Sequence, residues 1–125
     1  MMVSGLKIAS RTRSAATYSR VLAKYVREEK SLALMEALRK MTLMPAMVLE
    51  KRVPEMREKG RVRVGADADL TIFDPARIQD KASYEKPAVM SEGVRYVLIG
   101  GELVVKDGKV LDNVRAGKPI RAAVQ

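Results

Sequence analysis

The sequence has no cysteine, no histidine and no tryptophan, and its 125 residues include a single phenylalanine. Without cysteine the chain cannot form a disulfide, and thiolate nucleophiles and thiolate metal sites are excluded. Without histidine it also lacks the side chain that most often binds metal ions in proteins. A zinc site of the usual histidine and cysteine kind is therefore excluded on this chain.

Long hydrophobic runs are missing as well. No apolar stretch approaches the roughly 18 residues that predict a membrane-spanning helix, and residues 1–9 are too short and too weakly apolar for a secretory signal. Hydrophobic residues make up 47% of the chain and charged residues 31%, which is typical of one soluble globular domain. We expect a cytoplasmic protein with no membrane partner.

Positive charge is concentrated in the first half of the chain. The formal net charge is +9; residues 1–64 carry 15 Lys and Arg against 6 Asp and Glu, whereas residues 65–125 carry 9 of each. A basic half can indicate contact with nucleic acid, but aromatic residues for base stacking make up only 4%. We therefore do not favour nucleic acid as a partner. A solvated helical surface, or a surface that meets an acidic partner, explains the same charge.

The first half shows helical periodicity. Apolar residues recur at helical spacing on one face: Tyr18, Val21, Leu22, Tyr25 and Val26. Ser31 is then predicted to be the N-cap of a second helix over residues 31–42, which Pro45 limits because the residue before a proline is disfavoured in the α region. Residues 46–59 are predicted to form a short helical turn and an exposed connector.

From Gly60 onward the period becomes that of a strand. Residues 61–64 and 70–73 alternate and predict two strands, separated by a turn. In that turn we expect Asp67 and Asp69 to accept backbone hydrogen bonds, and we expect the face that carries Leu70 and Ile72 to pack in the sheet.

Two hairpins are predicted further on. Residues 94–99 and 102–106 are apolar strands joined by Gly100-Gly101, a pair that supplies the positive φ angles of a tight turn. Asp107-Gly108 is a second hairpin signal and leads into residues 109–111. The predicted fold class is therefore α+β, with N-terminal helices followed by a small antiparallel sheet or sandwich portion. The elements do not alternate as repeated βα units, so this chain alone does not predict a barrel.

The segment from Gly60 to Asp74, Gly-Arg-Val-Arg-Val-Gly-Ala-Asp-Ala-Asp-Leu-Thr-Ile-Phe-Asp, resembles the signature near the carboxyl end of the amidohydrolase superfamily. There the chain leaves the catalytic barrel for a small β domain. Residues 14–27, residues 31–42 and Pro45-Ala46 are similar to the last barrel helix of the D-aminoacylase branch, the N-acyl-D-amino-acid deacylases. The resemblance implies two domains: residues 1–59 as a helical remnant of the barrel end with a connector, and residues 60–125 as the small β domain.

Departures from the family pattern concern its catalytic residues. Ser4-Gly5-Leu6 stands where that branch has Ser-Asp-Gly, whose aspartate acts as general acid and base near the metal. Arg11-Thr12-Arg13 occupies the place of a His-Pro-Arg motif. Only Arg13 is retained, as a candidate contact to a substrate carboxylate; the alternative is an exposed arginine on a loop. We therefore assign no catalytic residue.

Zinc is expected in the full-length enzymes of the resembled family, on ligands from barrel strands that this chain does not contain. The carboxylates available here, Asp67, Asp69 and Asp74, lie on a turn without histidine and make a poor zinc site. We predict no metal ligands and no cofactor on this chain.

The leading functional prediction is the carboxyl-terminal structural part of a metal-dependent amidohydrolase similar to N-acyl-D-amino-acid deacylase, inactive as an isolated chain. A stand-alone interaction or assembly domain and, less favoured, a small basic nucleic-acid-binding protein are the alternatives. In the resembled family, strands from the amino terminus complete the small β domain. We therefore expect exposed edges and apolar helix faces to be covered by self-association, most simply a two-fold dimer, or by a missing barrel partner.

Overall fold

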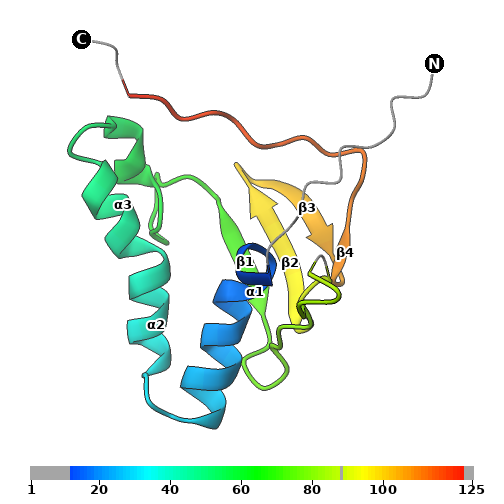
Figure 1. The fold of residues 1–125 in the computed structure, drawn as a ribbon. Coiled ribbons are helices and arrows are strands. Elements are labelled where there is room, and N and C mark those ends of the chain that lie inside the picture. Colours follow the sequence, from blue (N-terminus) through cyan, green and yellow to red (C-terminus); the bar gives the residue numbers. More distant parts are fainter. Residues whose placement is uncertain (1–11, 88, 123–125) are drawn as a thin grey trace.

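The computed structural model describes residues 12–87 and 89–122. The chain first forms helices: α1 (Thr12–Arg20), the π-helix η1 (Val21–Glu28), α2 (Leu34–Met41), α3 (Leu43–Leu49) and the 3₁₀ helix η2 (Pro54–Glu58). Strands follow: β1 (Leu70–Phe73), β2 (Val94–Ile99), β3 (Glu102–Lys106) and β4 (Lys109–Val110). The predicted α+β class is confirmed, with helices first and an antiparallel sheet second (Figure 1).

The first helical rod changes its hydrogen-bond pattern partway along. It begins as an α-helix and continues as a π-helix from Val21, in which the turns are wider. The predicted apolar face is only partly buried. Leu22 is buried, whereas Tyr18 and Tyr25 are exposed.

The predicted start of the second helix is wrong, whereas its predicted end at residue 42 agrees with the observed end at Met41 to within one residue. Ala33, not Ser31, precedes the first turn of α2, and the hydroxyl of Ser31 instead donates to the carbonyl of Tyr25 at the end of the preceding helix. Pro45, however, is not the cause of the end at Met41. It lies in the first turn of α3. Backbone N–H groups in the first turn have no carbonyl partner within the helix, so proline, which has no N–H, costs no hydrogen bond there. The interruption falls at Thr42, whose φ and ψ are −123° and −72°.

The sheet is a simple antiparallel meander with strand order β1-β2-β3-β4. Both predicted hairpins are confirmed: Gly100 and Gly101 have φ of 57° and 82°, and Asp107 and Gly108 have φ of 49° and 76°. β4 contains only two residues and ends at Val110.

The strand predicted at residues 61–64 does not form. This segment is an exposed turn in which Val62 and Val64 are 89% and 104% exposed, because no neighbouring strand among the described residues pairs with it. The prediction for the Leu70 and Ile72 face is also wrong for Ile72, which is 49% exposed. A shift in register between Ile72 and Phe73 lets Phe73 pack toward the core instead.

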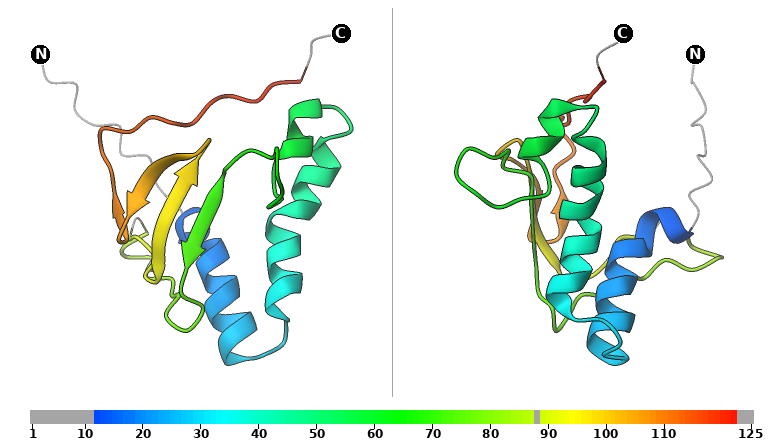
Figure 2. Two further views of the ribbon diagram at one scale, coloured as in Figure 1. Left: turned by 180° about the vertical axis from the view of Figure 1, so that it is seen from behind. Right: turned by 90° about the vertical axis from the view of Figure 1, so that its left-hand side faces the viewer.

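The core lies where the helices meet β1 and the segment that follows it. Leu22, Ala37 and Ile78 are buried at its centre, with Phe73 and Val94 packed against them. Helices η1 and α2 lie beside the β1 end of the sheet in both further views (Figure 2). This core joins residues from both predicted segments, and the division between residues 59 and 60 stays a prediction. No helix within the described residues is long and apolar enough to cross a bilayer.

Candidate functional site

The two aspartates of the turn before β1 share one lysine. Nζ of Lys59 lies 2.8 Å from Oδ2 of Asp67 and 2.5 Å from Oδ2 of Asp69. Hydrogen bonds to Asp67 and Asp69 raise the pKa of Lys59. The hydrogen bond from Lys59, followed by one from the Gly100 N–H, lowers the pKa of Asp69. Lys59 and Asp69 therefore favour their charged forms, and Asp67 joins them in a compact ion-pair cluster.

This cluster also attaches the turn to the β2–β3 hairpin. Oδ1 of Asp69 accepts a hydrogen bond from the Gly100 N–H at 2.7 Å, and the Gly101 N–H donates to the carbonyl of Ala68 at 3.0 Å. The expectation that Asp69 accepts a backbone hydrogen bond is confirmed, whereas the Asp67 side chain acts through Lys59. The signature turn is thus a structural clamp between the connector and the sheet.

The carboxylates present do not fit a zinc ion. Oxygens of Asp67 and Asp69 are paired with an ammonium group, and Oδ1 of Asp74 accepts the Ala76 N–H at 2.9 Å. Over the part of the chain that the structure describes, no three acidic, histidine or cysteine side chains come together in a way that could hold a metal. We derive no metal-dependent step from these residues.

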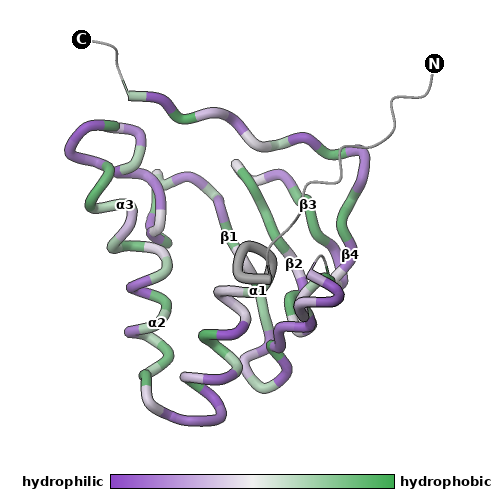
Figure 3. Tube along the Cα trace, viewed as in Figure 1, coloured by the Kyte–Doolittle hydropathy of each residue, from purple (hydrophilic) through white to green (hydrophobic). Residues whose placement is uncertain are grey.

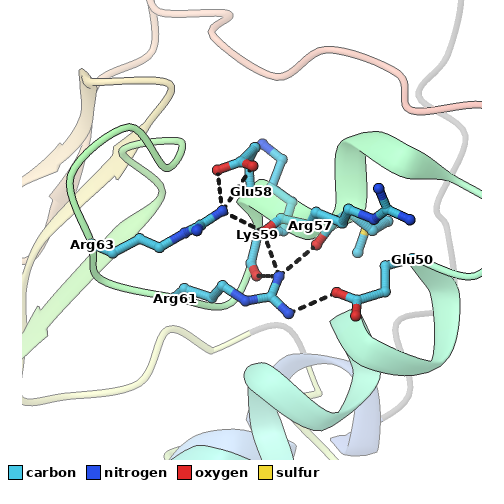
Figure 4. A network of polar contacts seen from close by, with 7 residues as sticks. Glu50, Arg57, Glu58, Lys59, Arg61 and Arg63 are labelled. Atoms are coloured by element: carbon cyan, nitrogen blue, oxygen red, sulfur yellow. Dashed lines mark hydrogen bonds and ion pairs between the residues drawn. The ribbon is translucent and has the colours of Figure 1, made fainter.

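A second polar network is centred on Arg61 (Figure 4). Its Nη2 donates to Oε2 of Glu50 at 2.6 Å. Its Nη1 lies within hydrogen-bond distance of three carbonyl oxygens around η2, those of Met56, Arg57 and Lys59. Arg61 therefore holds the end of α3, η2 and the connector together. The strand predicted at residues 61–64 does not indicate this role, which depends on the contact between Arg61 and Glu50 at the end of α3.

Two arginines of the first helical rod hold the segment that follows β1. Arg27 donates from Nη1 to the carbonyl of Ile78 and from Nη2 to Oε1 of Gln79 at 2.8 Å. Arg20 forms an ion pair of 2.7 Å with Asp80, whose side chain is only 10% exposed. Sequence reasoning missed both, because the partners are more than fifty residues apart.

Arg13, the predicted substrate contact, belongs to the backbone of α1. Its side chain lies outside the described residues, as do Ser4-Gly5-Leu6 and Arg11. The assignment of Arg13 therefore stays a prediction.

The hollows that the described residues line include two shallow ones. One, of about 490 Å³, is lined by Asp74, Arg77, Glu92, Arg95 and Asp107 among others. The other, of about 350 Å³, is an apolar hollow between η1, α2 and β1, with Leu22, Leu34 and Phe73 in its wall. In the first, Asp107 already accepts a hydrogen bond from the Tyr96 hydroxyl, which raises the pKa of Tyr96. Asp107 is thus already engaged by a side chain of the same sheet.

The chain is similar to members of one known protein family. The model of the amidohydrolase family matches residues 8–105. An N-acyl-D-glutamate deacylase and an N-acyl-D-aspartate deacylase, both from Alcaligenes xylosoxydans xylosoxydans, are 40% identical over 85 residues and 36% identical over 88 residues. These matches cover 68% and 70% of this chain, but only 16% and 17% of the relatives.

Solved structures show the same relationship in three dimensions. A D-aminoacylase structure, described for its binuclear metal centre, matches with a TM-score of 0.74 and 32% identity. The N-acyl-D-glutamate deacylase of Bordetella bronchiseptica, in complex with zinc and a phosphonate inhibitor, matches with a TM-score of 0.72 and 35% identity. They align with 82% and 83% of this chain and with 20% of their own chains. The chain thus spans about a sixth to a fifth of the length of the proteins it matches.

Proposed function

Because this chain belongs to the amidohydrolase family, we propose that it serves as the carboxyl-terminal structural part of a deacylase of the D-aminoacylase type and is inactive by itself. The observation that supports the proposal most strongly is the extent of the structural match. Helices and sheet together align over 82% of this chain with a D-aminoacylase at a TM-score of 0.74. The aligned region nevertheless contains no histidine or cysteine.

The proposed role is mechanical. The Lys59 and Asp69 cluster, with the Gly100 N–H, holds the connector to the sheet, and Arg27 holds the loop after β1 to the helices. A deacylase active site requires its reacting groups to stay within a fraction of an ångström of their productive positions. In this proposal the α+β unit gives such a site structural support, while the metal-binding residues belong to the rest of the enzyme. The proposal retains two domains, residues 1–59 and 60–125, and a cytoplasmic location.

Metal content and hydrolysis measured together test the proposed inactivity. The purified chain is incubated with zinc, desalted, and assayed with N-acetyl-D-glutamate and N-acetyl-D-aspartate, with the N-acyl-D-glutamate deacylase from Alcaligenes as the positive control. We expect no stoichiometric zinc and no hydrolysis above buffer. Stoichiometric zinc together with hydrolysis after metal loading would contradict the proposal.

Complementation tests the structural role. The Alcaligenes deacylase is truncated to remove the segment that this chain matches, and the truncated protein is expressed with and without this chain. We expect the chain to increase the soluble yield of the truncated protein and to restore measurable hydrolysis. Equal yield and equal activity in both cases would instead favour a stand-alone interaction domain.

A further inference from the structure

Helix α3 exposes its large side chains and buries a small one. None of its seven residues is charged, and the residue that it buries is Ala46. Met44, Met47, Val48 and Leu49 are exposed, Val48 by 71%. A surface helix normally does the reverse, burying its large apolar side chains and presenting polar ones to water. Exposed apolar area of this kind favours association with another surface.

The exposed residues form a stripe with a basic end. Met44, Met47 and Val48 are spaced i, i+3 and i+4, which places them on one face of the helix; we call them the α3 stripe. The tube is largely green or pale along this helix (Figure 3). Helical hydrogen bonds continue past Leu49, since the Glu50 N–H donates to the Ala46 carbonyl at 2.8 Å.

Lys51 and Arg52 follow Val48 by three and four residues and lie just beyond the end of α3. Both side chains are exposed. Within the described part of the chain neither forms an ion pair, because the adjacent Glu50 is engaged by Arg61 at 2.6 Å. The positive charge at this end of the stripe is thus available to a partner.

We propose that the α3 stripe, with Lys51 and Arg52 at its end, docks a second protein whose apolar surface is rimmed by carboxylates. Electrostatic repulsion disfavours a second copy of this chain as the partner. Each molecule carries a net charge of +9, all of it within residues 1–64, so a dimer through α3 places like charges together. This inference does not depend on the deacylase proposal, since it rests on the exposed apolar side chains of α3 and the charges of Lys51 and Arg52 alone.

Two synthetic helical peptides provide the probe. Both carry leucine at i, i+3, i+4 and i+7, and they differ only in having glutamate or lysine at the flanking positions. Binding to the full chain is measured by fluorescence anisotropy at low ionic strength. We expect the glutamate peptide to bind about tenfold more tightly than the lysine peptide, a difference that two new ion pairs at an exposed rim can produce.

Variants separate the local effect from the global charge. Lys51→Glu with Arg52→Glu should abolish or reverse the preference between the peptides, and Met47→Asp should weaken binding of both. Lys109→Glu with Lys118→Glu changes the net charge by the same amount at exposed positions far along the sequence, and should leave the preference largely intact. Circular dichroism checks that each variant folds. The Lys51/Arg52 substitutions lie beyond the end of α3, so this variant tests the proposal even if Met47→Asp does not fold.

Four results would overturn the proposal. The peptides could bind equally, or the matched control could lose the preference as fully as the Lys51/Arg52 variant. Alternatively, sedimentation could show a dimer that Met47→Asp dissociates, which would make a second copy the occupant. Binding of phosphatidylserine vesicles that Met47→Asp abolishes, without binding of the glutamate peptide, would assign the stripe to a membrane surface instead.

Discussion

Asp69 and Gly100 are 31 residues apart, yet the carboxylate of the first accepts the backbone N–H of the second at 2.7 Å. The other oxygen of the same carboxylate binds Lys59 at 2.5 Å. One side chain therefore connects the end of η2, the turn before β1 and the β2–β3 hairpin. A single small residue thus couples the helical part to the sheet.

Stability should depend on the ionisation of Asp69. Its pKa in the folded state is lowered by Lys59 first and by the Gly100 N–H second, from a usual value of 3.8. The stabilisation is therefore present above pH 3.8 and is lost as the pH falls through the lowered folded-state pKa. We expect Asp69→Asn to destabilise the chain at pH 7 by about 1–2 kcal/mol and to reduce the acid dependence of its denaturant midpoint.

Glu102→Gln is the control, because Glu102 is an exposed carboxylate on β3. The denaturant midpoint of Glu102→Gln should equal that of the wild type at every pH. A wild-type loss of stability in acid that Asp69→Asn leaves unchanged would show that another group is responsible.

The ionisation of Lys59 should make the stability of the chain depend on pH in the alkaline range. Its pKa is raised above 10.5 by Asp67 and Asp69, so its contribution is present below pH 10.5 and is lost as the pH rises through the raised value. We expect Lys59→Met to destabilise the chain at pH 7 by about 1 kcal/mol and to flatten the alkaline limb of the stability profile. An alkaline limb equal to that of the wild type would contradict this role.

Gly60 lies where the connector crosses the junction between α2 and α3. A Cβ added there would lie 2.6 Å from the carbonyl oxygen of Thr42, and φ is 68°. Gly65 has a similar φ of 86°, but nothing lies within 4 Å of its Cβ position. Gly65→Ala should therefore cost only the strain of a left-handed residue, about 1 kcal/mol. Gly60→Ala should cost more, by at least about 1 kcal/mol, measured by urea denaturation. Equal losses would show that Thr42 moves aside freely.

Local signals in the sequence predicted the sheet well. The hairpins at Gly100-Gly101 and Asp107-Gly108 were predicted because positive φ is a property of the residues themselves, and the structure has positive φ at all four. The strand at residues 61–64 was not local in this sense. Residues 61–64 do alternate between arginine and valine, but a strand also needs a neighbour that pairs with it.

Most of the polar contacts that define the candidate sites could not be predicted from the sequence. The absence of histidine and cysteine could be read directly, and so could the role of Asp69 as an acceptor in a turn. The pairing of Arg20 with Asp80 joins residues 60 positions apart and leaves no periodic signal. Ser31 had the right chemistry for a cap, but its hydroxyl closes the preceding helix instead.

The pairing of Arg20 with Asp80 can be measured by a double-mutant cycle. Asp80 is 10% exposed, so Arg20→Ala leaves a largely buried carboxylate without its main partner, at an expected cost of about 1–3 kcal/mol. Removing both side chains in Arg20→Ala/Asp80→Ala should be less destabilising than the sum of the single variants. Additive losses in urea denaturation would mean that the ion pair contributes nothing of its own.

The geometry of Arg61 should matter more than its charge. Its planar fork reaches Glu50 on one side and carbonyl groups around η2 on the other, whereas a lysine ammonium cannot span both. We expect Arg61→Lys to lower the free energy of unfolding by about 1–2 kcal/mol. Arg63 offers the matched control: it pairs with Glu58 from a side chain that is 54% exposed, and Arg63→Lys should change stability by less than about 0.5 kcal/mol. If the two lysine variants melt alike, the fork of Arg61 does not hold α3 to the connector.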